Sequence, residues 1–146
     1  MLLLLRHGAA ADGSPDAERP LTKKGRDQAR AAGAALRVLG ISVDACLSSP
    51  KVRALDTAQL ACAELNGPEP QTAEELAGGD FDGEALAADR GKTVLLVGHD
   101  PDFSNAVRNL TGARAQVKKG GIAAIDRGEL KALLRPAELA AIAAGS

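Results

Sequence analysis

Residues 2–8 read LLLLRHG, four leucines followed directly by an arginine, a histidine and a glycine. The leucines fit either an export signal or membrane anchor, or a buried strand with two ionisable side chains at its end. An export signal needs an apolar stretch of about 7–15 residues behind basic residues, and a membrane span needs about 20. Arg6 ends the apolar run after Leu5. The run therefore predicts a central strand that is buried on both faces. We also expect a soluble, cytoplasmic protein with no membrane partner.

Apolar runs and helical patterns alternate along the rest of the chain, as they do in α/β proteins. Besides residues 2–5, strands are predicted at residues 43–47, 93–97, 122–126 and 129–134, the last two joined as a hairpin. Helices are predicted at about residues 22–38, 50–65, 84–89, 101–110 and from residue 136 onward. This order predicts an α/β fold: a three-layer α/β/α sandwich with a mainly parallel central sheet, in a single domain over residues 1–146.

Two of the helices have a strong start signal in the sequence. Ser49 precedes Pro50, and Asp100 precedes Pro101. Serine and aspartate are preferred N-cap residues, and proline is favoured at the first helical position. We therefore expect Ser49 and Asp100 to cap the helices that follow them.

The composition argues against several classes of function. The 146 residues carry a formal net charge of -1, so no strong field attracts nucleic acid or an anionic membrane. Trp and Tyr are absent, and only Phe81 and Phe103 remain as aromatic platforms for single-stranded nucleic acid. Cys46 and Cys62 match no zinc spacing and are predicted to be small buried side chains rather than a disulfide. The sequence thus predicts no nucleic-acid partner, no metal and no cofactor.

Ionisable side chains lie just after three of the predicted strands, either directly at the end of the strand or in the first turn of the next helix. Arg6 and His7 follow the first strand, Arg53 lies in the first turn of the helix after the second strand, and His99 follows the strand at residues 93–97. Right-handed crossovers bring the carboxyl ends of parallel strands to one edge of the sheet. Two arginines, two histidines and nearby helix N-termini at one edge predict a site for a dense anion such as a phosphoryl group.

Four motifs in this order resemble those of the histidine phosphatase superfamily, whose fold is shared with the phosphoglycerate mutases. The motifs are RHG at residues 6–8, DAERPLTKKG at 16–25, SSPKVRALDTA at 48–58 and GHDP at 98–101. The second stretch is similar to that of the small SixA-type branch of phosphohistidine phosphatases. The resemblance implies a phosphoglycerate mutase-like fold, and 146 residues leave no room for the cap domain of larger members.

The resemblance also implies the chemistry of the site. His7 would attack phosphorus and form a phosphohistidine enzyme, which water then hydrolyses to inorganic phosphate. Arg6, Arg53 and His99 would bind the phosphoryl oxygens. Further substrate contacts are expected from Gly8, Thr22 and Ser48, although Thr22 also suits a helix cap. The expected substrate is a phosphorylated protein carrying phosphohistidine. The alternatives are a small-molecule phosphomonoesterase or a phosphate-binding module without catalysis.

A general acid for the leaving group is the least determined part of the site. In the wider superfamily a carboxylate before the strand at residues 93–97 has this role, and Glu75 is our choice for it, with Glu74, Asp80 and Asp82 as alternatives. Imidazole, with a pKa of about 6.5, leaves more easily than an alkoxide, so a phosphohistidine phosphatase can work with a weaker general acid. Lys118 and Lys119 fit either a solvated pair or a border of the pocket that attracts an acidic phosphoprotein.

Overall fold

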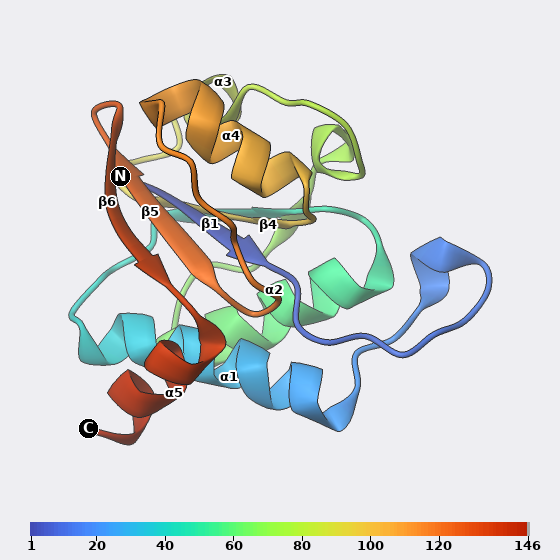
Figure 1. Cartoon of the computed structure of the whole chain (residues 1–146). Helices are drawn as coiled ribbons and strands as arrows, with labels where there is room; N and C mark the ends of the chain where they lie inside the picture. The colour runs from blue at the N-terminus through green and yellow to red at the C-terminus, as the bar shows by residue number, and fades with distance from the viewer. Residues whose placement is uncertain (146) are drawn as a thin grey trace.

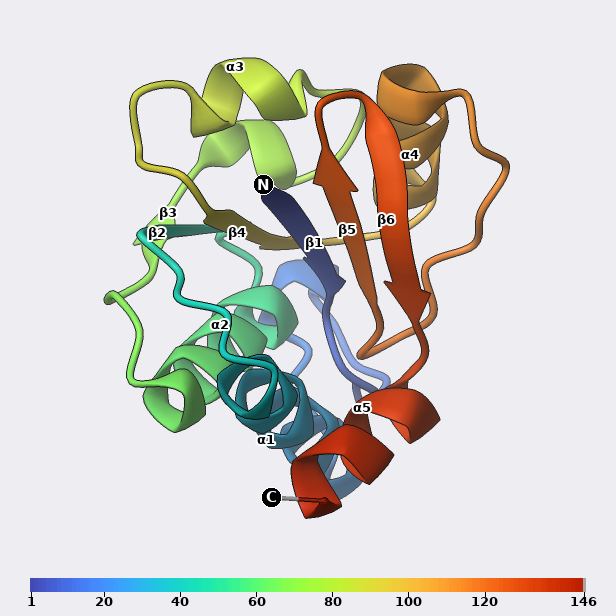
Figure 2. The same ribbon diagram turned by 90° about the vertical axis from the view of Figure 1, so that its left-hand side faces the viewer.

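The five predicted strands and one further strand form a six-stranded sheet in the computed structural model, which describes residues 1–145 (Figures 1 and 2). The strand order is β3-β2-β4-β1-β5-β6. The strands are β1 Leu2–Arg6, β2 Ala45–Ser48, β3 Gln71–Thr72, β4 Val94–Gly98, β5 Ile122–Asp126 and β6 Glu129–Leu134. The sequence did not predict β3, because two exposed residues leave no apolar pattern.

Strand β1 lies inside the sheet, as its leucines predict. It pairs in parallel with β4, so that Arg6 lies opposite Gly98, and it pairs antiparallel with β5 on its other side. β2 pairs in parallel with both β4 and β3, whereas β5 and β6 form the predicted antiparallel hairpin. The sheet is therefore mainly parallel, and the carboxyl ends of β1, β2 and β4 meet at one edge.

Helices cover both faces of the sheet, which confirms the three-layer α/β/α architecture. Helices α1, α2 and α5 lie on one face, and α3 and α4 lie on the other (Figures 1 and 2). Their bounds are α1 Lys23–Val38, α2 Val52–Leu65, α3 Gly83–Ala87, α4 Asp102–Thr111 and α5 Pro136–Ala144, with 3-10 turns η1 Asp16–Glu18 and η2 Glu74–Leu76. Over the described residues no cap domain covers the carboxyl edge, as expected, and no helix is long and apolar enough to cross a membrane.

The four leucines of β1 divide between two cores. Leu3 and Leu5 pack among residues of α1, α2 and α5, while Leu2 and Leu4 pack with Phe103 and other residues of the opposite layer. This division follows from the strand geometry, in which successive side chains point to opposite faces. Leu4 and Leu5 have no exposed surface, so β1 is anchored on both faces and its carboxyl end is held firmly.

Both predicted helix starts are displaced towards the C-terminus by one or two residues. Helix α2 begins at Val52 with Lys51 as N-cap, and the Ser49 hydroxyl only accepts the backbone N–H of Lys51, at 3.2 Å. Helix α4 begins at Asp102, although the Asp100 carboxylate accepts the backbone N–H of Ser104 within its first turn, at 2.9 Å. Both N-cap predictions are therefore wrong, since Lys51 and Pro101 occupy the N-cap positions. The Ser49 hydroxyl has another partner, described below, and Asp100 bonds to the first turn of α4 from one position before its N-cap.

The remaining local predictions agree with the structure. Thr22 caps α1 by accepting the backbone N–H of Gly25 at 3.1 Å. Cys46 and Cys62 are buried and not joined by a disulfide. The predicted short helix at residues 84–89 is α3, which begins one residue earlier and ends at Ala87.

Candidate active site

His7 lies directly beyond β1, and its ring is buried beside the backbone of Gly8. The ring Nδ1 lies 2.6 Å from the carbonyl oxygen of Gly8, so we assign the proton to Nδ1 and a free lone pair to Nε2. Burial lowers the pKa of His7 to about 4, against the Gly8 hydrogen bond, and the charges of Arg53 and Arg6 lower it further. His7 is therefore neutral near pH 7, with Nε2 available to form a bond.

His99 lies directly beyond β4, and its ring centroid is 5.2 Å from that of His7. Its Nε2 is 2.8 Å from the Ser49 hydroxyl. The Ser49 hydroxyl also accepts the N–H of Lys51. We assign its proton to the bond with Nε2, which places the ring proton of His99 on Nδ1. Burial, followed by the neighbouring His7 and Arg53, lowers the pKa of His99 to about 3. His99 is thus a neutral ring that presents an N–H donor.

Two arginines are held in place by segments distant in sequence. Arg6 Nη1 donates to the carbonyl of Val117 at 3.0 Å and lies 4.0 Å from the Asp100 carboxylate. Arg53 Nη1 donates to the backbone carbonyl of Asp16 at 2.9 Å, and its Nη2 donates to the Asp16 carboxylate at 3.2 Å. Both guanidinium groups are therefore fixed before any ligand binds.

Three buried nitrogen atoms of this cluster have no hydrogen-bond partner within residues 1–145: Arg6 Nε, Arg53 Nε and His99 Nδ1. Each of them is an N–H donor in the protonation states described above. Buried donors are normally paired, since an unpaired one costs free energy. Three such donors from three different elements indicate an anion with several acceptor oxygens.

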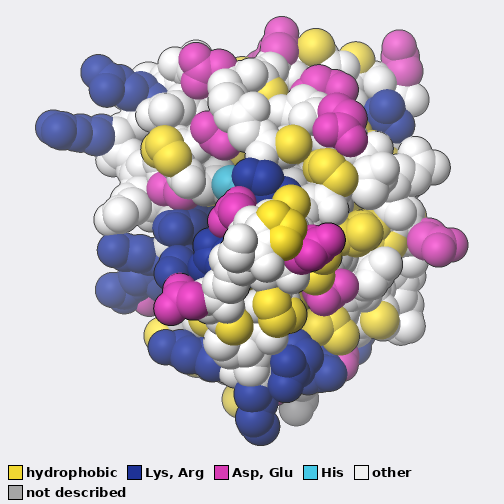
Figure 3. Space-filling model, turned by 90° about the vertical axis from the view of Figure 1, so that its right-hand side faces the viewer, with side chains coloured by type: hydrophobic (Ala, Val, Ile, Leu, Met, Phe, Trp, Pro, Cys, Tyr) yellow, Lys and Arg dark blue, Asp and Glu magenta, His cyan; other side chains and the backbone are white. Residues whose placement is uncertain are grey.

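A cavity of about 290 Å³ opens at this point of the carboxyl edge. It is lined by Arg6, His7, Arg19, Lys51, Arg53, Ala77, Gly78, His99, Asp100, Asp102 and Lys119. Figure 3 views the molecule from this side and shows a histidine at the surface, with Lys and Arg side chains gathered beside and below it. Lys119 borders the cavity, whereas the exposed Lys118 donates to the side chain of Gln116 at 3.0 Å.

The backbone after His7 packs directly on the start of α1. A Cβ atom on Gly8 would lie 2.5 Å from the carbonyl oxygen of Gly25, and one on Gly25 would lie 2.0 Å from that of Ala9. The Gly8 N–H donates to the Thr57 hydroxyl, which donates in turn to the carbonyl of Arg53. Gly8 and Gly25 therefore allow an approach that no side chain would permit, and this approach positions the carbonyl that orients His7.

The sequence model described as "Histidine phosphatase superfamily (branch 1)" matches residues 2–92. The chain belongs to the histidine phosphatase superfamily. A relative from Picosynechococcus sp., an uncharacterized protein, is 34% identical over 140 residues, which cover 87% of this chain and 85% of that protein.

Solved structures of this superfamily match the whole fold. The protein histidine phosphatase SixA, complexed with tungstate, has a TM-score of 0.81 and 26% identity, covering 94% of this chain and 98% of that one. A SixA structure from Nakamurella multipartitia has a TM-score of 0.70 and 27% identity, covering 95% and 88% of the two chains. These findings confirm the resemblance to the SixA-type branch and its phosphoglycerate mutase-like fold.

Some of the residues that the sequence predicts for the site do not lie at the cavity. Ser48 is fully buried, and its hydroxyl donates to the carbonyl of Ser49 at 2.9 Å. Thr22 caps α1 and donates to the carbonyl of Ala9, while Gly8 contributes packing beside His7. Glu75 is exposed on η2 and does not line the cavity. The sequence places Glu75 near the site, but the direction in which the 3-10 turn presents its side chain is set by tertiary packing.

The site also contains residues that the sequence pattern did not indicate. Ser49 contacts His99, Asp16 holds Arg53, and Asp102 lines the cavity from the first turn of α4. The charge of Asp16 is stabilised by hydrogen bonds from Arg19 and Arg53, which lower its pKa to about 2. The only available signal was that Asp16 and Ser49 lie inside two of the superfamily motifs.

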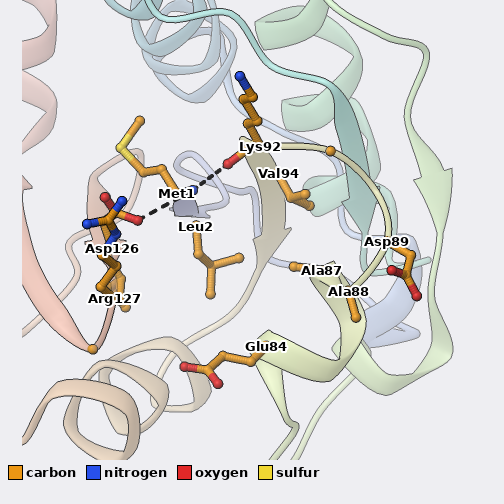
Figure 4. Close-up of a pocket in the computed structure, with 13 residues that line it drawn as sticks. Met1, Leu2, Glu84, Ala87, Ala88, Asp89, Lys92, Val94, Asp126 and Arg127 are labelled. Carbon is orange, nitrogen blue, oxygen red and sulfur yellow. Dashed lines mark hydrogen bonds and ion pairs between the residues drawn. The ribbon is translucent and has the colours of Figure 1, made fainter.

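A second hollow lies at the opposite end of the sheet and is drawn in Figure 4. There the amino group of Met1 donates to the carbonyl of Lys92 and lies 3.8 Å from the Asp126 carboxylate. Neither histidine lines it. Within residues 1–145 no group of three His, Cys, Asp or Glu side chains lies close enough to hold a metal ion.

The two buried histidines predict a loss of stability on acidification. In the folded protein the pKa values of His7 and His99 are about 4 and about 3, below the ordinary value of 6.5. Between the folded and ordinary pKa values the unfolded chain therefore binds more protons than the folded chain does. The free energy of unfolding should therefore fall as the pH falls from 7 to 5. Urea unfolding at both pH values measures this, and His99→Asn should reduce the difference. Carboxylates titrate mainly below this window, and an equal difference in the variant would refute the assignment.

Proposed function

We propose that this chain is a phosphohistidine phosphatase that forms a covalent phosphohistidine on His7 and releases inorganic phosphate. The observation that carries the proposal is the set of three unpaired buried donors on Arg6, Arg53 and His99, placed around the neutral His7 ring. The similarity to SixA, a protein histidine phosphatase, favours phosphohistidine in a protein as the substrate.

In the first step, His7 Nε2 attacks phosphorus, a P–N bond forms, and the bond to the leaving group breaks. The hydrogen bond from Nδ1 to the Gly8 carbonyl stabilises the positive charge that develops on the ring. In the second step, water attacks the phosphohistidine and restores neutral His7. A covalent intermediate divides one difficult displacement into two easier ones.

The phosphoryl group spreads its charge over three equatorial oxygens in the transition state, so electrostatic stabilisation accounts for most of the catalysis. Arg6 and Arg53 supply fixed positive charge and free Nε–H donors, and His99 adds the Nδ1–H donor. Because Val117, Asp16 and Ser49 already hold these three side chains, little reorganisation is needed when the substrate binds.

The position of the cavity suits a bulky substrate. It opens at the edge of the sheet where the described part of the chain has no covering domain. Figure 3 shows Lys and Arg side chains beside the histidine that is visible at the cavity mouth, and Lys51 and Lys119 line the cavity. These positive charges would attract a phosphorylated, acidic protein surface.

A substrate panel tests the proposal. A phosphohistidine protein, phosphoserine and a sugar phosphate are offered to the wild-type chain, with phosphate release and rapid-quench labelling of His7 as readouts. We expect every substrate that is turned over to label His7 with phosphate. The phosphohistidine protein should give the largest kcat/KM of the three. Much faster turnover of the sugar phosphate would favour a small-molecule phosphomonoesterase. Phosphate binding without any label would favour a binding module.

The two adjacent serines offer a matched test of how His99 is oriented. Ser49→Ala removes the hydroxyl that faces His99 Nε2, and Ser48→Ala removes one that bonds only to a backbone carbonyl. Both side chains are fully buried, so their effects on stability should be similar. We expect Ser49→Ala to lower kcat about 10-fold, by freeing the other His99 tautomer, and Ser48→Ala to leave it within about 2-fold. Equal losses in the two variants would contradict the role of Ser49.

A further inference from the structure

Three carboxylates lie at the cavity or on its arginines, and two of them are fully engaged. Asp16 is within 4 Å of Arg19, Lys51 and Arg53, which keep it ionised. Both oxygens of Asp100 lie 2.8 Å from the Ser104 hydroxyl, and one also lies 4.0 Å from Arg6. Both carboxylates therefore have their oxygens engaged by side chains of the protein.

Asp102 differs from these two in its surroundings. It lines the cavity three residues after His99 and is half-buried, and within residues 1–145 it has no ion-pair partner. Burial raises the pKa of its carboxyl, and the charges of Asp80 and Asp100 add to this rise. The backbone hydrogen bond from Gly79 and the charge of Lys51 act in the opposite direction, but the net pKa is raised. The carboxyl of Asp102 thus takes up a proton more readily than an ordinary aspartate does.

We propose that Asp102 is the general acid and base of the reaction, in place of the exposed Glu75. As the bond from phosphorus to the leaving atom breaks, the Asp102 carboxyl gives its proton to that atom, and the bond from phosphorus to His7 forms. Asp102 then takes a proton from the water that attacks the phosphohistidine, so both residues return to their starting states. This inference rests on the proposed function, because it needs His7 as the nucleophile.

The charge of a bound substrate favours the protonated form of Asp102. A phosphoryl group in the cavity brings negative charge close to Asp102, and like charges favour the protonated form of a carboxyl. The demand on the acid depends on the leaving group, since an alkoxide must be protonated as it leaves and a nitrophenolate need not be. The contribution of Asp102 should therefore grow with the pKa of the leaving group.

The decisive experiment compares three substrates with Asp102→Asn: p-nitrophenyl phosphate, a phosphohistidine peptide and phosphoserine. We expect the rate of His7 phosphorylation to fall less than about 3-fold, about 10-fold and at least about 100-fold respectively. Glu84→Gln, which removes an exposed carboxylate at the opposite hollow, is the matched control and should give wild-type rates throughout. Inorganic phosphate should bind the Asp102→Asn variant with an affinity within about 3-fold of wild type.

Several outcomes would overturn the assignment. An equal loss with all three substrates would mean that Asp102 acts through folding or binding, and no loss with phosphoserine would exclude it as the acid. If Glu75→Gln shows the leaving-group dependence instead, the role belongs to Glu75. A wild-type measurement provides a second test, because phosphoserine turnover should fall at high pH as Asp102 loses its proton. A wild-type chain that forms no His7 label with p-nitrophenyl phosphate would instead refute the proposed function.

Discussion

Replacing His7 with alanine is expected to abolish the phosphoenzyme and to lower turnover of every substrate by at least about 10⁴-fold. In the proposed reaction His7 is the only group of the site that forms a covalent bond. Without it the remaining donors can bind phosphate but cannot divide the reaction into two steps. Rapid-quench labelling with a phosphohistidine protein, followed by acid treatment, measures the loss, because phosphohistidine is acid-labile.

The second histidine provides the control for this variant. His99→Ala removes an N–H donor but leaves His7 and its bond to the Gly8 carbonyl intact. We expect it to be labelled on His7 at a rate about 10²–10³-fold below wild type. A label that persists in His7→Ala, or one that is absent from His99→Ala at long times, would contradict the assignment of the nucleophile.

Arg53→Ala is expected to lower kcat/KM by about 10²–10³-fold, through loss of the charge and the Nε–H donor that meet the phosphoryl oxygens. Arg53→Lys restores a positive charge but not the planar group that binds two oxygens at once, so it should recover only a small part of the rate. Steady-state kinetics of the three proteins, with inorganic phosphate as a competitive inhibitor, measures the loss, and phosphate inhibition should weaken in parallel.

Arg53 also anchors the loop that contains Asp16, and this second role has its own test. Asp16→Asn weakens the ion pair with Arg53 but leaves the guanidinium group at the cavity. Because the Asp16 carboxylate is largely exposed, its loss should change kcat/KM by less than about 10-fold. If Asp16→Asn is as damaging as Arg53→Ala, Arg53 acts by holding the loop and not by binding phosphate.

Much of the fold and the centre of the site could be predicted from local pattern. The four leucines of β1 predict a strand covered on both faces, and Leu3 and Leu4 indeed enter different cores. The positions of Arg6, His7 and His99 follow from the rule that parallel strands present their carboxyl ends at one edge. These predictions succeed because they depend on residues adjacent in sequence to strands that the apolar runs identify.

Glu75 and Ser48 do not line the cavity, although the sequence predicts both at the site. Each of these predictions depends on the direction of a side chain. Adjacent residues on a strand point to opposite faces, so the choice between Ser48 and Ser49 depends on how β2 enters its loop. Ser49 faces His99 and Ser48 turns to the backbone. On the 3-10 turn, the exposed Glu75 side chain lies outside the cavity, while the buried Leu76 next to it enters the core.

Local patterns in the sequence predict the α/β order, the central place of β1 and the histidines and arginines at the carboxyl edge of the sheet, because apolar periodicity and short motifs are local properties. The tertiary fold sets the contacts of Asp16 with Arg53 and of Ser49 with His99, and it places Asp102 at the cavity wall. Those contacts join residues up to 50 positions apart. They depend on the packing of whole elements, which no local pattern specifies.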